Sequence, residues 1–118
     1  MEFNANKPIY RQIVDFCYRE IATGVWEADG RIPSVKDLSV KLAVNNRTIL
    51  NAYDELQAQE IIYQKRGLGY FVACDAKEKI LSEQRKEFFE EIVPGIHHKM
   101  KLLGITPEEL VKYLNSAE

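Results

Sequence analysis

Cysteine is scarce in this chain of 118 residues, which holds only Cys17 and Cys74. The two do not form a CxxC pair, so the sequence indicates neither a disulfide framework nor a cysteine-based zinc site. Both lie among apolar neighbours. We therefore expect two reduced thiols in the core of a cytoplasmic protein.

Long apolar runs and targeting signals are missing as well. No stretch approaches the roughly 20 consecutive apolar residues that a membrane-spanning helix needs. The first residues, Met1-Glu2-Phe3-Asn4, lack the basic segment and apolar core of a secretory signal. These absences predict that the chain has no membrane partner.

An excess of charge of one sign is also absent, because 16 Lys and Arg stand against 18 Asp and Glu, which gives a net charge of −2. The balance is even along the chain, with nine basic and ten acidic residues in 1–75 and seven and eight in 76–118. Binding to nucleic acid through the overall charge is excluded. If the chain binds DNA, its positive charge must be local.

The motifs of common enzyme classes are missing too. The sequence has no P-loop, no dinucleotide-binding glycine motif and no Ser/His/Asp set, and its length excludes a large α/β cofactor fold. His97 and His98 are adjacent, so on a helix they point about 100° apart and cannot share a metal site by themselves. We expect no enzyme, no cofactor and no metal.

Helical periodicity is what the chain does have. Apolar residues recur at helical spacing over 8–23, 34–42 and 46–59. Ser34 is suited to cap the second of these helices, and Asn45 or Asn46 the third, because their side chains accept hydrogen bonds from free N–H groups.

The period changes after the third helix. Residues 61–63 and 70–73 are rich in β-branched and aromatic side chains, and they flank the glycine turn Gly67-Leu68-Gly69. This pattern predicts a β-hairpin. The fold class is therefore mostly α with a small β-hairpin, a winged helix-turn-helix domain over residues 1–75.

Residues 76–118 form a second part with a composition rich in Glu, Lys, Gln and Leu. The spacing predicts helices over 77–92 and 96–103, with Pro94-Gly95 expected to break or kink the chain between them. Thr106 begins a further helix. We interpret this part as a short helical dimerisation segment.

The tail holds more apolar side chains than so short a segment can bury against itself. The predicted dimerisation residues are Phe88, Phe89, Ile92, Val93, Ile96, Met100, Leu103, Leu110, Val111 and Leu114. A second copy of the chain would cover them, and closed two-fold pairing is the commonest assembly. The alternative is a monomer in which the tail folds back onto residues 1–75.

Polar side chains cluster at the start of the helix predicted over 46–59. They are Asn45, Asn46, Arg47, Thr48 and Asn51. A helix in the major groove reads bases with its N-terminal residues, and Arg pairs with guanine as Asn does with adenine. The alternative for the first two asparagines is that they only cap the helix.

Further residues are expected to contact DNA around this helix. Ser34, Lys36 and Lys41 lie on the preceding helix, whose free N–H groups can hold a phosphate. Lys65, Arg66 and Gly67 lie at the hairpin tip, where the glycine allows a close approach of the backbone.

Five segments of the chain follow a known pattern. They are Pro8-Ile9-Tyr10-Arg11-Gln12-Ile13, Ile32-Pro33-Ser34-Val35-Lys36-Asp37-Leu38, Val44-Asn45-Asn46-Arg47-Thr48-Ile49, Ala52-Tyr53-Asp54-Glu55-Leu56 and Arg66-Gly67-Leu68-Gly69-Tyr70-Phe71-Val72. Together they resemble the N-terminal domain of the GntR family of bacterial transcriptional regulators. The tail is similar to that of the YtrA-like short subfamily, in which a short helical segment dimerises the protein.

The resemblance implies a sequence-specific DNA-binding transcriptional regulator, a repressor that acts as a homodimer on a two-fold-related operator in double-stranded DNA. Lys36 stands where the family has an arginine that contacts DNA, so the charge is kept and the bidentate fork is lost. Glu60 stands where many members have glycine, and we expect that helix end to be strained or lengthened.

Two further possibilities stay open at this point. A cleft between the tail and the winged domain could admit a small-molecule effector, which no residue identifies. The rival function is a winged-helix protein-interaction module that binds no DNA, and the net charge of −2 favours it. A steep salt dependence of DNA binding would separate the two functions.

Overall fold

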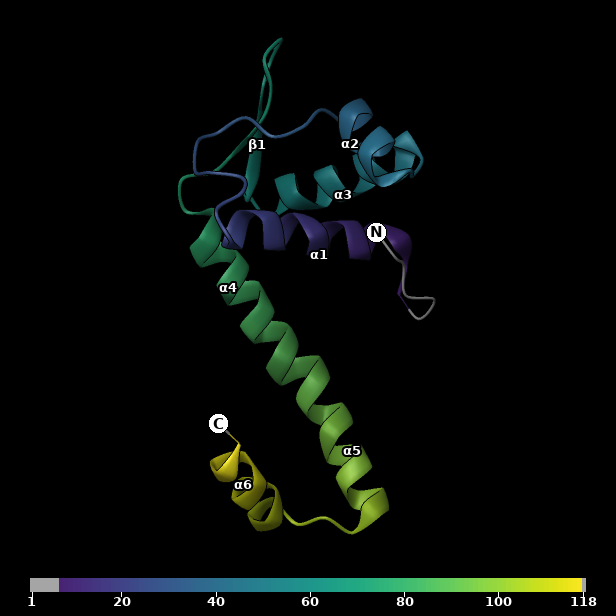
Figure 1. Ribbon diagram of the computed structural model, residues 1–118, viewed down its shortest axis with the longest axis vertical. Coiled ribbons are helices and arrows are strands. Elements are labelled where there is room, and N and C mark those ends of the chain that lie inside the picture. The colour runs from purple at the N-terminus through teal and green to yellow at the C-terminus, as the bar shows by residue number, and fades with distance from the viewer. Residues whose placement is uncertain (1–6, 118) are drawn as a thin grey trace. The chain divides into compact units, whose positions relative to one another are not determined.

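The computed structural model describes residues 7–117, and it divides into two compact units, the first ending at Leu81 and the second beginning at Ser82. The elements follow in the order helix, helix, helix, hairpin and then further helices (Figure 1). This confirms the predicted fold class. No helix in the described part has the length and apolar character that a bilayer crossing requires.

The first unit is the winged helix-turn-helix. Its elements are α1 (Ile9–Ala22), α2 (Val35–Leu42), α3 (Asn46–Ala58), β1 (Ile62–Lys65) and β2 (Gly69–Val72). Helices α1 and α3 lie side by side (Figure 1), and the strands pair antiparallel, with Ile62 opposite Val72 and Lys65 opposite Gly69.

The core of this unit comes from one face of each helix. Ile13 and Val14 of α1 and Ile49 and Leu56 of α3 are fully buried, as the helical spacing predicts. Tyr53 is also fully buried, and its hydroxyl donates to the Pro33 carbonyl oxygen at 2.7 Å. Burial raises the pKa of the Tyr53 hydroxyl, so the group stays protonated and keeps this bond.

The two cysteines lie in different surroundings. Cys17 is fully buried in the core, as expected, and burial raises the pKa of its thiol. The expectation for Cys74 was wrong, because that residue is exposed. It comes two residues after the last residue of β2, in the short connection to the helix that begins at Ala76, and its side chain lies outside the core.

The turn between α2 and α3 is short and tightly bonded. Ser34 Oγ accepts from the Asp37 N–H at 3.0 Å and caps α2. Ala43 ends α2 in the left-handed conformation, with φ 56° and ψ 46°. Asn45 Oδ1 then accepts from the Arg47 N–H at 2.7 Å, which makes Asn45 the cap of α3.

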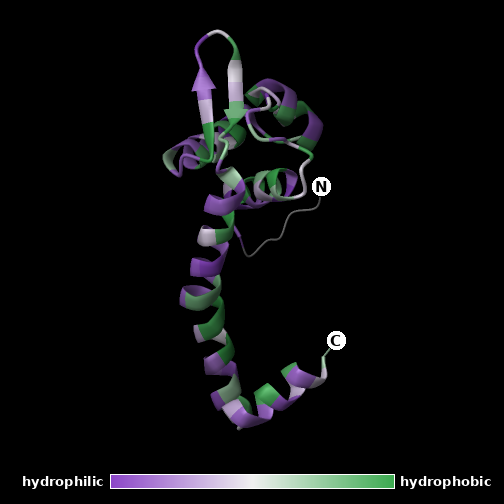
Figure 2. Cartoon of the chain, turned by 90° about the vertical axis from the view of Figure 1, so that its left-hand side faces the viewer, coloured by the Kyte–Doolittle hydropathy of each residue, from purple (hydrophilic) through white to green (hydrophobic). Residues whose placement is uncertain are grey.

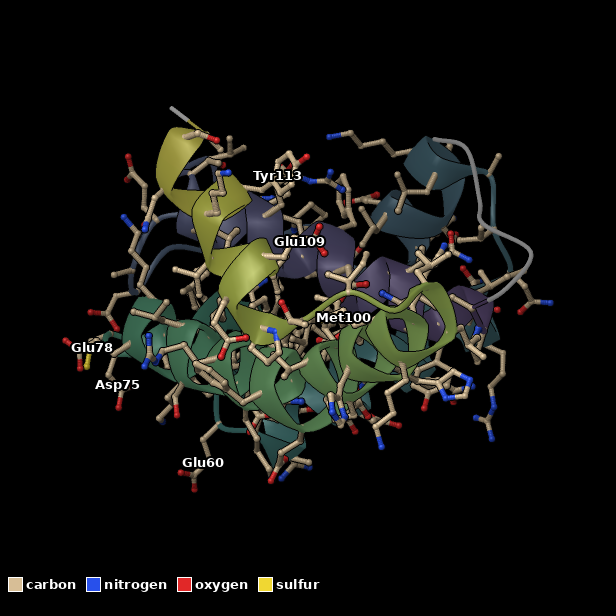
Figure 3. All side chains as sticks on the ribbon, turned by 90° about the horizontal axis from the view of Figure 1, so that it is seen from below. Glu60, Asp75, Glu78, Met100, Glu109 and Tyr113 are labelled. Atoms are coloured by element: carbon tan, nitrogen blue, oxygen red, sulfur yellow. The ribbon has the colours of Figure 1, made fainter. Side chains whose placement is uncertain are left out.

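The end of α3 is strained, not lengthened. The helix ends at Ala58, and Glu60 has a φ of 58°. This left-handed conformation suits glycine, whereas a residue with a Cβ pays a steric cost there. The side chain itself is exposed and projects outward (Figure 3).

Replacing Glu60 with glycine should therefore stabilise the protein. We expect the free energy of unfolding to rise by about 1 kcal/mol, since the relief of left-handed strain exceeds the entropy that glycine adds to the unfolded chain. Urea or thermal unfolding measures this. The matched control is Glu60→Ala, which removes the 3.8 Å ion pair with Lys79 but keeps the Cβ. If Glu60→Ala raises the free energy of unfolding by the same amount, the destabilisation comes from the carboxylate of Glu60 and not from its backbone conformation.

Helix α4 (Ala76–Glu87) begins inside the first unit. Ala76 and Ile80 are each 1% exposed and belong to the same core as α1 and α3. For this reason the compact unit continues past the predicted boundary near Asp75 and reaches Leu81.

The remaining helical segments follow without the break that Pro94-Gly95 was expected to cause. They are η1 (Phe88–Ile92), which is a π-helical turn, α5 (Val93–Leu103) and α6 (Pro107–Ser116). In η1 the Val93 N–H donates to the Phe88 carbonyl, five residues back. Proline in a helix clashes with the carbonyl four residues earlier, and the wider π turn just before Pro94 relieves that clash.

Candidate nucleic-acid interface

The start of α3 presents polar side chains to solvent. Asn46, Arg47 and Asn51 are exposed, and Thr48 is half-buried. Because Arg47 and Asn51 are four residues apart, they lie on one face of the helix, opposite the face that Ile49 buries in the core. The arrangement leaves an exposed surface of amide, hydroxyl and guanidinium groups in the first turn and a half.

Asn45 lies at the same end of α3, but the oxygen of its side chain already has a hydrogen-bond partner. Its side-chain oxygen caps α3 by accepting from the Arg47 N–H. Capping the helix therefore uses the oxygen of this side chain and leaves its nitrogen for a DNA contact. The amide nitrogen of Asn45 makes no hydrogen bond within the described residues, and it can still donate to a base or phosphate.

Helix α2 and the hairpin supply the predicted cations. Lys36 and Lys41 are exposed on α2, and Ser34 is half-buried because it caps that helix. At the hairpin tip Lys65 and Arg66 are exposed.

The tip itself is a tight turn. The Leu68 N–H donates to the Lys65 carbonyl at 2.9 Å, and Gly67 has a φ of 78°. A left-handed residue is needed there, and glycine adopts it without strain.

These cations have no acidic partner in the part of the chain that the structure describes. Elsewhere in the first unit, Lys7 pairs with Asp15 at 2.7 Å and Lys79 with Asp75 at 3.2 Å. Within residues 7–117, by contrast, no carboxylate makes an ion pair with the cations of α2, the start of α3 or the hairpin tip, which are Lys36, Lys41, Arg47, Lys65 and Arg66. The local positive charge that DNA binding requires is therefore present despite the negative net charge.

One arginine near the hairpin was absent from the sequence-based set. Arg31 is exposed and forms an isolated antiparallel bridge to Phe71 of β2. It lies in the connection between α1 and α2, where no periodic pattern marks it. Only the pairing of distant segments brings it to the sheet.

The predicted dimerisation residues are mostly exposed in the single chain. Phe89 is 59% exposed, Ile96 41% and Leu114 62%. Phe88, Ile92, Val93, Leu103 and Val111 are also exposed, and Leu110 is half-buried. Figure 2 shows hydrophobic residues recurring along these helices. The described part of the second unit does not bury these residues against its own helices.

Met100 differs from the rest of that set. It is 9% exposed and is the buried residue of α5. Its carbonyl accepts from the Ile105 N–H at 2.9 Å, where the chain turns between α5 and α6, and its side chain lies among the helices of the second unit (Figure 3). It supports the fold of this unit from within.

The family model matches the first unit of the chain, and similar proteins match both units. Residues 9–72 match the family model described as bacterial regulatory proteins, gntR family. The chain is 34% identical to YhcF of Bacillus subtilis, an uncharacterized HTH-type transcriptional regulator, over 94% of this chain and 90% of that protein. It is 26% identical to the HTH-type transcriptional repressor YtrA of Bacillus subtilis, over 93% of this chain and 84% of that protein.

Solved structures extend the similarity to both units and to DNA complexes. A GntR family transcriptional regulator from Listeria monocytogenes aligns with a TM-score of 0.79 and 37% identity, over 98% of this chain and all of that one. The DNA-binding domain of AraR, in complex with operator ORR3, aligns with a TM-score of 0.56 and 32% identity, over 62% of this chain and 86% of that one.

Proposed function

Because the chain belongs to the GntR family of bacterial transcriptional regulators, we propose that it represses transcription by binding, as a homodimer, a two-fold-related operator in double-stranded DNA. The proposal treats it as a regulator that acts in the cytoplasm and not as an enzyme. The similarity to a protein named as the repressor YtrA supports the sign of regulation.

The observation that carries the proposal is the exposed first turn of α3. Asn46 and Arg47 lie there with no described partner for their side chains, on a helix whose other face is fixed in the core. Such a helix end enters the major groove, where arginine recognises guanine and asparagine recognises adenine. The operator complex of the similar AraR domain supports this role.

The exposed apolar side chains of the second unit support the dimer. A second copy would remove Phe89, Ile96 and their neighbours from water, which is favourable in proportion to the apolar area covered. Two-fold pairing would also present two α3 helices about 34 Å apart, which is one turn of DNA.

A small-molecule effector, if the regulator has one, has a place to bind within the first unit. A cavity of about 450 Å³ lies there, with Ile21, Trp26, Val72 and Ala76 among its apolar lining and Cys74 beside them. A molecule in this cavity would contact the start of α4, which leads to the dimerisation segment.

The test is a selection of bound duplexes from a random DNA pool, followed by fluorescence anisotropy on the enriched site. We expect an inverted repeat to be enriched and the affinity to fall steeply with salt, because each neutralised phosphate contributes about 0.9 to the slope of log affinity against log salt concentration. Enrichment of no sequence, or binding that salt leaves unchanged, would favour the protein-interaction module instead.

The same assay tests the phosphate contacts. Lys36→Ala and Arg66→Ala should each lower the magnitude of the salt slope by about one, and they should weaken binding to all sequences alike. The control is Arg19→Ala, which removes an exposed arginine from α1, outside the helix-turn-helix and the hairpin. Slopes that stay at the wild-type value in both variants would reject these contacts.

A further inference from the structure

We propose that Arg31 is a DNA-contacting residue of the wing, whose guanidinium holds a backbone phosphate beside the groove that the hairpin tip enters. The inference rests on the proposed operator binding. It adds to the interface a residue that lies outside both helices of the helix-turn-helix and outside the hairpin in sequence.

Arg31 belongs to the sheet although it lies in a connection. It pairs with Phe71 as an isolated antiparallel bridge, and the next N–H, that of Ile32, donates to the Tyr70 carbonyl at 3.0 Å. Ile32 is 3% exposed and points into the core, whereas Arg31 is exposed. Since successive side chains of an extended segment alternate, the arginine lies on the outer face of the wing.

Gly69 provides the room for the arginine. A Cβ placed on Gly69 would lie 3.1 Å from Arg31 Nε and 3.6 Å from Nη2, so the guanidinium occupies the space that a side chain would fill. Gly69 pairs with Lys65 at the end of the hairpin next to its tip. Arg31, Lys65 and Arg66 therefore bring three cations to that end of the wing.

The charges around Arg31 leave it available. Within residues 7–117 no carboxylate makes an ion pair with it, and the acid two residues earlier, Asp29, accepts a hydrogen bond from the Tyr63 hydroxyl at 3.3 Å. On the same outer face, the Lys65 ammonium lies 4.8 Å from the centroid of the Phe71 ring. The outer face of the wing thus carries Arg31 together with Lys65, whose ammonium lies beside an aromatic ring.

A DNA phosphate is the ligand that this chemistry fits. The planar guanidinium donates two parallel hydrogen bonds to phosphate oxygens. A wing tip in a groove has a phosphate strand on each side, and the outer face of the sheet meets one of them. Arg31 would fix the position of the wing without reading bases.

The test uses the full chain and the selected operator, with anisotropy titrations between 50 and 200 mM salt. Arg31→Ala should lower the magnitude of the salt slope by about 0.9, so the loss of affinity across this range should be about 3.5-fold smaller than in the wild type. Arg31→Lys keeps a charge at the site and should retain most of the slope. Arg19→Ala, the matched control, should behave as the wild type.

Two results would overturn the proposal, and they differ from a failure of operator binding. If the salt slope of Arg31→Ala equals the wild-type slope, the proposed phosphate contact of Arg31 is rejected, while operator binding by the protein still holds. A lower melting temperature in Arg31→Ala with an unchanged slope would assign the residue to the stability of the sheet. If the wild type shows no salt-dependent binding to the selected site, the proposed function fails and this inference fails with it.

Discussion

Replacing Arg47 with alanine should weaken binding to the selected operator by about 1–3 kcal/mol and should abolish the preference at one base pair of each half-site. The expected loss is large because a bidentate contact between arginine and guanine carries both affinity and selectivity. Anisotropy titrations against the operator and against a duplex changed at that base pair measure both. In the variant the two duplexes should bind almost equally.

The structure separates this effect from a loss of folding. Arg47 is exposed, and its backbone N–H, not its side chain, makes the capping bond with Asn45. Alanine keeps that N–H and is a better helix former, so the melting temperature should not fall. A loss that is equal for all DNA sequences would instead identify Arg47 as a phosphate contact.

Replacing Phe89 and Ile96 together with glutamate should convert the proposed dimer into a monomer. Both side chains are exposed in the single chain, at 59% and 41%, so the change should spare the folded unit and act on the pairing of two copies. Loss of the second half-site should lower operator affinity roughly a hundredfold or more, since linked binding multiplies affinity by that order. Sedimentation velocity and anisotropy measure the two effects.

Leu102→Glu is the matched control for this variant. Leu102 is also exposed in α5, at 73%, and is not among the predicted interface residues. It should leave both dimer and affinity intact. A wild-type chain that sediments as a monomer at micromolar concentration would reject the dimer.

A truncation gives an independent view of the same interface. The chain should be cut after Leu81, because Ile80 and Ala76 are buried in the first unit and a shorter chain would lose part of its core. Residues 1–81 should be monomeric and bind a half-site weakly. A dimer of this fragment would place the interface in the winged helix-turn-helix.

Local chemistry is what made much of this fold predictable from sequence. Ser34, Asn45 and Thr106 each accept the backbone N–H two or three residues ahead, and such caps depend only on neighbouring residues. The departure at Glu60 was also visible, because a left-handed position selects for glycine whatever surrounds it.

The features that the sequence did not reveal depend on distant parts of the chain. Cys74 has apolar neighbours but follows the last buried residue of β2, so its exposure depends on where the strand ends. Arg31 reaches the sheet of the wing only through its bridge to Phe71, forty residues away in sequence. Taken alone, Pro94 predicts that the helix breaks. The helix tolerates this proline because of the π turn before it, which the sequence pattern does not show.

That π turn also sets the angular phase of the tail. A turn closed by hydrogen bonds to the fifth residue holds one residue more than an α turn, and one residue corresponds to about 100° of rotation about the helix axis. Everything after Ile92 is therefore offset by that angle from the face that an uninterrupted helix starting at Ala76 would give it. Deleting a single residue within Phe88–Ile92 would remove the extra residue of the wide turn, so regular α winding would return with Ile96 and Leu103 close to their present faces. Regular α winding of the unchanged sequence would instead rotate Ile96 and Leu103 by about 100°, so the π turn decides which apolar side chains of α5 share a face with Phe88 and Phe89.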